Sequence, residues 1–270
     1  MSRSSRKMKS NRLSFVWKQM NVQFHMRALS VFSFGLLVVQ PAVFSGIGYL
    51  LARMAGRAMP DLFHVIIGGG IMGLWSSLVF TSFFDISNDR REGTLELIVG
   101  SPTSLGSILA IRTLTNIITG TISLALSFLV VMLVFHYSPP INNLLPIVLS
   151  LCIMLFAFWC IGFFLAHFQV WSRLSGTFIN YLELPVAILA AFMFPFEYLP
   201  HWIRWLSNML PIRWAVTALG TSFQPVIEIQ NLWLDWLFAL GISCVYLVIT
   251  WYLSSRVHDM IRVSGELHSV

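Results

Sequence analysis

The densest group of charged side chains in this 270-residue chain lies in one short segment. It holds six of the 28 charged residues, namely Asp85, Asp89, Arg90, Arg91, Glu92 and Glu96. Gly93 and Thr94, followed by the apolar Leu95, predict a short helix that Thr94 caps and that Pro102 ends. Charges mixed with leucines suit a shallow groove on another protein. A solvated connecting loop is the alternative interpretation of this segment.

The patterns that most often mark catalysis are missing. Lysine occurs only at positions 7, 9 and 18, so the chain has no Gly-x-x-x-x-Gly-Lys loop for nucleotide phosphates. It has no His-Glu-x-x-His and no Gly-x-Ser-x-Gly motif either. Its three cysteines, Cys152, Cys160 and Cys244, lie in apolar runs without metal-ligand spacing. We therefore expect no catalytic, cofactor or metal site on this chain, which we do not expect to be an enzyme.

The composition indicates where the chain resides. Hydrophobic residues make up 57% of it and charged residues 10%, whereas an ordinary soluble domain carries about 25% charged residues. An integral membrane protein follows, and disorder and a disulfide scaffold are excluded. Much of the net charge of +6 comes from seven basic residues that precede the first apolar run without any acid. We expect them to contact anionic lipid headgroups rather than nucleic acid.

Six apolar stretches have the length of about 20 residues that a membrane-spanning helix needs. We place them at residues 29–52, 62–84, 113–134, 144–170, 178–194 and 232–253. The polar–apolar alternation typical of a membrane barrel is absent, so the predicted fold is an all-α integral membrane protein with six transmembrane helices. Residues 1–28 form a tail, 29–253 the transmembrane domain and 254–270 a second tail. Gly69 and Gly73 in the second stretch form a GxxxG pair that favours close helix packing.

Lysine and arginine placement predicts the orientation. The tails and connections on one side of the membrane hold 13 basic residues, and the connections on the other side hold four. This difference predicts that both termini lie in the cytoplasm. On that side, residues 11–27 form an amphipathic elbow helix, with Leu13, Val16, Trp17, Met20 and Phe24 on one face. Its role is either a simple interfacial anchor or an anchor that also touches a cytoplasmic partner.

Two further features stand out within the spans and the outer connection. Glu183 lies inside the fifth apolar stretch, where a charge costs about 2.5–3.5 kcal/mol. It either faces a path through the membrane or a second chain, or lies near enough to the inner headgroups to stay hydrated. Residues 195–231 hold two short helical patterns, the first between Pro200 and Pro211 with Trp202 and Trp205. They predict a re-entrant or interfacial hairpin on the outer side.

The amino-acid sequence of these segments resembles that of a known family. Residues 91–96 (Arg-Glu-Gly-Thr-Leu-Glu), Ser101-Pro102 and Ile111-Arg112 resemble the ABC-2 type transporter permeases. A second block looks like the outer segment of the same family: Phe194-Pro195, Leu199-Pro200-His201-Trp202 and Leu210-Pro211-Ile212-Arg213. The order of the parts matches as well, from the basic elbow helix to the outer hairpin before the sixth span.

The resemblance implies a permease subunit of an exporter, multi-pass in the bacterial cytoplasmic membrane. Within the loop 85–105, the residues Arg90, Arg91, Glu92, Gly93, Thr94, Leu95 and Glu96 would form a coupling helix. It would dock on a separate ATP-binding cassette subunit, which holds the ATP and Mg, and two permease chains, identical or paralogous, would pair. The implied substrate is hydrophobic or amphiphilic: a drug, an antibiotic, a lipid-like molecule or a lipo-oligosaccharide. The alternatives are a polysaccharide or O-antigen-type permease and an ion-coupled secondary transporter, for which only Glu183 offers a proton site.

Overall fold

The computed structural model describes residue 35 and residues 39–54, 59–93, 105–135, 143–172, 181–194, 196–224, 226 and 228–264. Every regular element in these ranges is a helix. Their bounds are α3 Gln40–Met54, α4 Met59–Arg91, α6 Leu105–Phe135, α7 Leu144–Ser172, α9 Glu183–Leu189, η2 Phe196–Tyr198, α10 His201–Asn208, α11 Pro211–Ser222 and α12 Ile229–Ser264. The predicted elbow helix at residues 11–27 lies outside the described residues.

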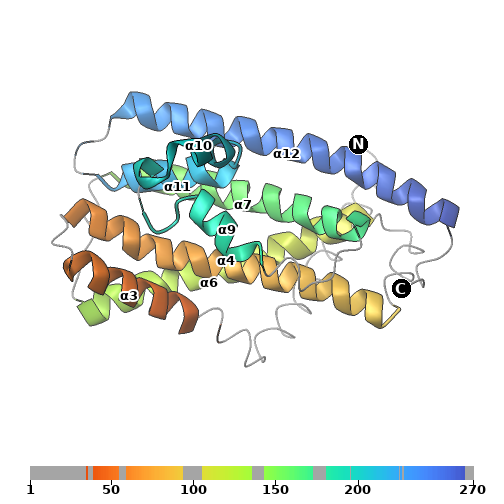
Figure 1. Ribbon diagram of the computed structural model, residues 1–270, viewed down its shortest axis with the longest axis horizontal. Coiled ribbons are helices and arrows are strands. Elements are labelled where there is room, and N and C mark those ends of the chain that lie inside the picture. Colours follow the sequence, from red (N-terminus) through yellow and green to blue (C-terminus); the bar gives the residue numbers. More distant parts are fainter. Residues whose placement is uncertain are drawn as a thin grey trace, which may run out of the picture.

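The long helices α4, α6, α7 and α12 lie along the long axis of the molecule (Figure 1). The ends at Arg91, Leu105 and Ser172 share one end of the bundle with the carboxyl end of α12 (Figure 1). The short helices α10 and α11 gather toward the other end, where α4 and α12 begin (Figure 1). The chain therefore crosses the bundle back and forth, as a multi-pass membrane protein must.

Three described helical stretches are long and apolar enough to cross a membrane: Leu105–Val130, Leu144–Ser172 and Ile229–Arg256. They agree with the third, fourth and sixth predicted spans. Helix α12 passes through Asp235 without a break and continues to Ser264, beyond the predicted end of the sixth span at residue 253. Helix α4 likewise continues to Arg91, so the first third of the predicted loop 85–105 is helical.

The fifth apolar stretch differs from a straight span in the described residues. Helix α9 covers seven residues and ends at Leu189, whereas we predicted a span to Phe194. The amide of Ala191 donates to Ile188 O and that of Phe192 donates to Ala187 O, while Ala191 adopts a φ of 54°. This is a Schellman motif, which stops a helix through one left-handed residue. The Phe192 side chain, which follows the left-handed residue, is buried in the core.

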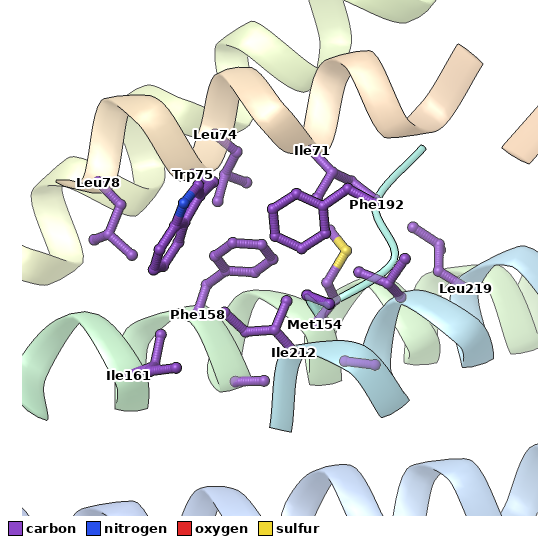
Figure 2. Packing of buried hydrophobic residues seen from close by; sticks show 14 of the residues in the cluster. Ile71, Leu74, Trp75, Leu78, Met154, Phe158, Ile161, Phe192, Ile212 and Leu219 are labelled. Carbon is purple, nitrogen blue, oxygen red and sulfur yellow. The ribbon is translucent and has the colours of Figure 1, made fainter. Parts of the chain in front are cut away.

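The core joins α4, α7, α11 and the turn after α9 (Figure 2). The Phe158 ring lies 6.1 Å from the Trp75 ring and 5.9 Å from the Phe192 ring, between centroids. Glycines on α4 allow the backbones of neighbouring segments to approach this helix closely. A Cβ on Gly68 would overlap the Phe192 carbonyl oxygen and lie 2.9 Å from Met193 Cα. Small residues at helix contacts are the usual means of close packing in membranes.

Candidate functional site

The first candidate site is a polar cluster around Glu183, at the start of α9. Its carboxylate Oε1 accepts hydrogen bonds from Ser76 Oγ and, at 3.3 Å, from Gln40 Nε2. Gln40 Nε2 also donates to Ser76 Oγ at 2.8 Å, and Trp75 Nε1 donates to the Glu183 backbone oxygen at 3.1 Å. Residues from two helices, α3 and α4, thus surround the acid on α9 with hydrogen-bond donors. None of these partners carries a positive charge.

The depth of this cluster follows from its place on α4. Ser76 lies 17 residues after Met59 and 15 residues before Arg91, or about 25 Å and about 22 Å along the helix from its two ends. Glu183 therefore contacts the middle of a long helix. On α9 the apolar side chains of Leu184 and Ile188 are exposed one turn apart, and Tyr181 precedes them. The acid thus lies beside a short apolar face that is exposed in the part of the chain that the structure describes.

The second candidate site is the charged end of α4. Arg90 and Arg91 form its last turn, and the Glu92 amide donates to Asn88 O at 2.9 Å. Gly93 follows with a φ of 66°, the left-handed conformation that commonly terminates helices. The Glu92 side chain is exposed. Thr94, Leu95 and Glu96, the rest of the predicted coupling helix, lie outside the described residues.

Polar contacts hold the helices together near this end. Arg112 on α6 forms an ion pair with Asp89 on α4, and both side chains are mostly buried. Asn116 Nδ2 donates to Ser82 Oγ at 2.8 Å, one turn deeper in the same helix pair. Arg112, which immediately precedes the predicted third span (residues 113–134), thus forms an ion pair with a neighbouring helix. The end of α4 is attached to α6 by charge as well as by packing.

The third candidate site is the pair of short helices α10 and α11, which occupies the predicted outer connection. Pro200 is the N-cap residue of α10, and Pro211 is the first residue of α11, where its missing N–H costs no hydrogen bond. Trp202 and Trp205 on α10 are 71% and 61% exposed. Arg204 folds the preceding turn against the helix by donating to Leu199 O at 2.9 Å and to Glu197 O at 2.7 Å.

Helix α11 enters the bundle rather than lying on it. At its carboxyl end, Ser222 Oγ lies 2.7 Å from Ser150 Oγ in the second turn of α7. At its amino end, Ile212 is fully buried beside Phe158 and Met154 (Figure 2). Because its two ends contact different heights of α7, α11 packs along α7 inside the bundle. It lies in the segment for which we predicted a re-entrant or interfacial hairpin.

An apolar cavity of about 140 Å³ lies between α4, α6, α7 and α11. Its lining includes Ile67, Leu124, Phe128, Leu151 and Leu219. This pocket has about the volume of an engineered apolar cavity that binds benzene. It therefore offers room for one small apolar group. No group of three or more His, Cys, Asp or Glu side chains that could hold a metal occurs in the described ranges.

Comparison of the sequence with known protein families assigns the chain to one of them. The sequence pattern of the ABC-2 type transporter family matches residues 3–223. The chain belongs to the ABC-2 type transporter family. No curated protein sequence matches the chain. The matched range includes the charged end of α4, Glu183 and both short helices, so all three candidate sites lie within the family region.

Membership of the ABC-2 family establishes the coarse function. The chain is the membrane subunit of a transporter, and members of this family associate with an ATP-binding cassette subunit and are generally not catalytic themselves. The resemblance predicted from residues 91–96 and from the Pro200–Pro211 segment is thereby confirmed at the level of the family.

Sequence reasoning missed the environment of one residue of this ABC-2 permease. Arg213, which lies in the predicted outer connection 195–231, is 7% exposed and lies between the rings of Phe196 and Trp214. Its guanidinium carbon is 3.7 Å and 3.8 Å from the two ring centroids. The signal available in the sequence was the position of this arginine two residues after Pro211, in a helix that has no other charged residue.

Proposed function

We propose that this chain is the permease subunit of an exporter for a hydrophobic or amphiphilic substrate, driven by a separate ATP-binding subunit. Two permease chains, identical or paralogous, would form the path between them. Both termini would lie in the cytoplasm of a bacterial cell. The charged end of α4 carries this proposal, because it presents Glu92 to the surroundings at one end of a bundle of membrane-spanning helices.

The architecture explains how partner binding would reach the membrane. Helix α4 is continuous over 33 residues from Met59 to Arg91. Arg90 and Arg91 in its last turn are therefore joined by continuous helix to Ser76, which donates to Glu183 half-way along α4. The Asp89–Arg112 ion pair attaches the same end to α6. A displacement of residues 90–96 by an ATP-binding subunit would be transmitted along α4 to the middle of the bundle.

Charge removal at the end of α4 tests the partner assignment. We expect Glu92→Ala and Glu96→Ala to weaken recovery of the ATP-binding cassette protein with tagged permease while the permease stays inserted. The reason is that loss of one member of a buried charge pair at an interface typically costs about 2–5 kcal/mol. Glu228→Ala is the matched control, because Glu228 is also an exposed acid but precedes α12 at the opposite end. Wild-type stoichiometry and full stimulation of ATP hydrolysis in both coupling variants would falsify the assignment.

Glu183 is our candidate for the path or for the contact between the two chains. Its position half-way along α4, its lack of a basic partner among the contacts above and the exposed Leu184 and Ile188 beside it support this proposal. We expect Glu183→Gln to leave expression unchanged and to alter export, because glutamine keeps the shape and removes the charge. Ser76→Ala removes one donor but keeps the acid, and we expect it to alter export less. Wild-type export by Glu183→Gln would exclude Glu183 from the path.

The size and lining of the apolar cavity favour substrates with apolar groups. Its walls offer aliphatic and aromatic side chains, with Ser127 as the one hydroxyl-bearing side chain among the lining residues. A polysaccharide without a lipid portion would find few hydrogen-bond partners there. No comparable observation favours the polysaccharide-type or ion-coupled alternatives.

A further inference from the structure

The most unusual charge in the described structure is Arg213, the third residue of α11. Only 7% of its surface is exposed. The carboxyl end of α11 meets the second turn of α7 through Ser222 and Ser150. Arg213 lies nine residues earlier in the same helix, which is about 13 Å deeper in the bundle. This arginine therefore belongs to the interior of the membrane domain, where an ionisable group normally requires a partner.

The two aromatic neighbours satisfy only part of what this cation needs. Phe196 and Trp214 stabilise the guanidinium through cation–π contacts with their ring faces. The N–H groups lie in the guanidinium plane and are not satisfied by a ring face. Nε and Nη1 are both buried and have no hydrogen-bond partner in the part of the chain that the structure describes. An arginine stays charged in proteins, so these donors require an acceptor to offset the cost of their burial.

Asp235 on α12 is the acid best placed to be that acceptor. The Trp214 ring stacks on the Phe238 ring with centroids 4.5 Å apart, which brings the amino-terminal part of α11 against α12. Asp235 precedes Phe238 by three residues and so lies on the same side of α12. Asp235 and Glu197 are the two acids near the Arg213 guanidinium. Asp235 is half-buried and Glu197 is exposed, so water and salt screen the attraction of Asp235 for the guanidinium less. No ion pair joins Arg213 to either acid among the described residues.

We propose that Arg213 and Asp235 are positioning residues that form a charge pair between α11 and α12. In the structure described above the pair is open, and it closes to a direct hydrogen-bonded contact when α11 moves against α12. The closed pair supplies the acceptor that Nε and Nη1 lack and neutralises the acid in α12. It would fix the depth of α11 inside the membrane domain. The proposal goes beyond the export function and does not depend on the substrate or on the ATP-binding subunit.

Four forms of the full-length chain in detergent test the pair: wild type, Arg213→Met, Asp235→Asn and the double variant. The measurement is the fraction of monodisperse protein that survives a fixed heat challenge. Removing one member of a buried pair leaves the other charge uncompensated, whereas replacing both is often neutral. We expect Asp235→Asn to lose the most, roughly ten-fold or more in the surviving fraction. Arg213→Met should lose less because a lone carboxyl group can take up a proton.

The decisive result is the double variant, which we expect to survive better than either single variant. The control double variant Arg213→Met with Glu228→Gln should show no such recovery, since Glu228 bonds Asn231 at the start of α12. Asp235→Glu, which keeps the charge, should restore most of the stability that Asp235→Asn loses, which a purely steric role would not predict. The proposal would be overturned if the surviving fraction of the Arg213→Met and Asp235→Asn double variant fell by the product of the two single-variant losses.

A second outcome would also overturn the proposal. If Asp235→Asn survives like wild type or better while Arg213→Met and the double variant are equally impaired, the acceptor is an external anion, such as a lipid phosphate. If Asp235→Asn does not fold at all, the double variant still decides, because its recovery supports the pair and its failure excludes it. Each of these results leaves the partner assignment at the end of α4 unaffected, since no ATP-binding subunit is present.

Discussion

Substitution of Gly69 by alanine tests how closely α3 and α4 pack. A Cβ added to Gly69 would lie 2.6 Å from Ser45 N and 2.9 Å from Ser45 Cα, and it would overlap Ser45 Oγ. Real Cβ atoms essentially never approach other heavy atoms closer than 3.0 Å. Because two of these atoms belong to the backbone of α3, a side-chain rotation cannot relieve the overlap. Gly69→Ala must therefore displace α3 from α4.

The expected change in the free energy of unfolding has two destabilising contributions and one stabilising contribution. Overpacking a close contact costs about 1–3 kcal/mol. The Ser45–Ser127 hydrogen bond between α3 and α6 would also be disturbed, at a cost of about 0.5–1.5 kcal/mol. Alanine returns about 0.5–1 kcal/mol because it is a better helix former than glycine. We expect Gly69→Ala to lower the free energy of unfolding by about 2 kcal/mol, near the middle of the sum of these ranges.

Gly241→Ala provides the matched control in the same protein. Gly241 lies in α12, and a Cβ there would meet nothing within 4 Å. It should gain the helix-forming contribution without the overlap, and so be as stable as wild type or slightly more stable. The assay is the temperature at which half of the monodisperse protein is lost, where Gly69→Ala should lie roughly 2–10 °C below wild type. A midpoint for Gly69→Ala at or above that of Gly241→Ala would refute the packing argument.

Four other predictions follow from single features. Ala191→Gly should raise the same midpoint, since alanine in the left-handed conformation costs about 1–2 kcal/mol; a lower midpoint would mean that the methyl group contributes packing. Asp89→Asn should lower the free energy of unfolding by about 1.5–3 kcal/mol, because it removes the charged partner of Arg112. A midpoint temperature equal to that of the wild type would show that this ion pair contributes little. Replacing Trp202 and Trp205 together by serine should impair folding or export more than partner recovery, and unchanged export would exclude that role. A cysteine at position 265, after replacement of the native thiols, should be labelled only in permeabilised cells, because 13 basic residues against four place the carboxyl terminus inside.

The sequence alone was sufficient for the features that depend on composition over long stretches. The spans at α6, α7 and α12 were predicted because about 20 consecutive apolar residues have few soluble alternatives. The two helices α10 and α11 were predicted because prolines delimit them and an apolar pattern fills each one. The family resemblance was carried by two local blocks, residues 91–102 and the segment from Phe194 to Arg213, and needed no knowledge of contacts.

The tertiary structure decided the features that depend on which groups meet. Nothing in the local sequence indicates that α9 stops after seven residues, because an alanine and not a glycine adopts the left-handed conformation. At this turn Phe192 is buried between Trp75 and Phe158. Glu183 was recognised as an unusual acid, but Ser76 and Gln40 bind it from positions more than 100 residues away. The buried Arg213 depends on α11 entering the bundle beside α12. Such contacts depend on chain topology and close packing, so the physical properties of one residue and its sequence neighbours do not specify them.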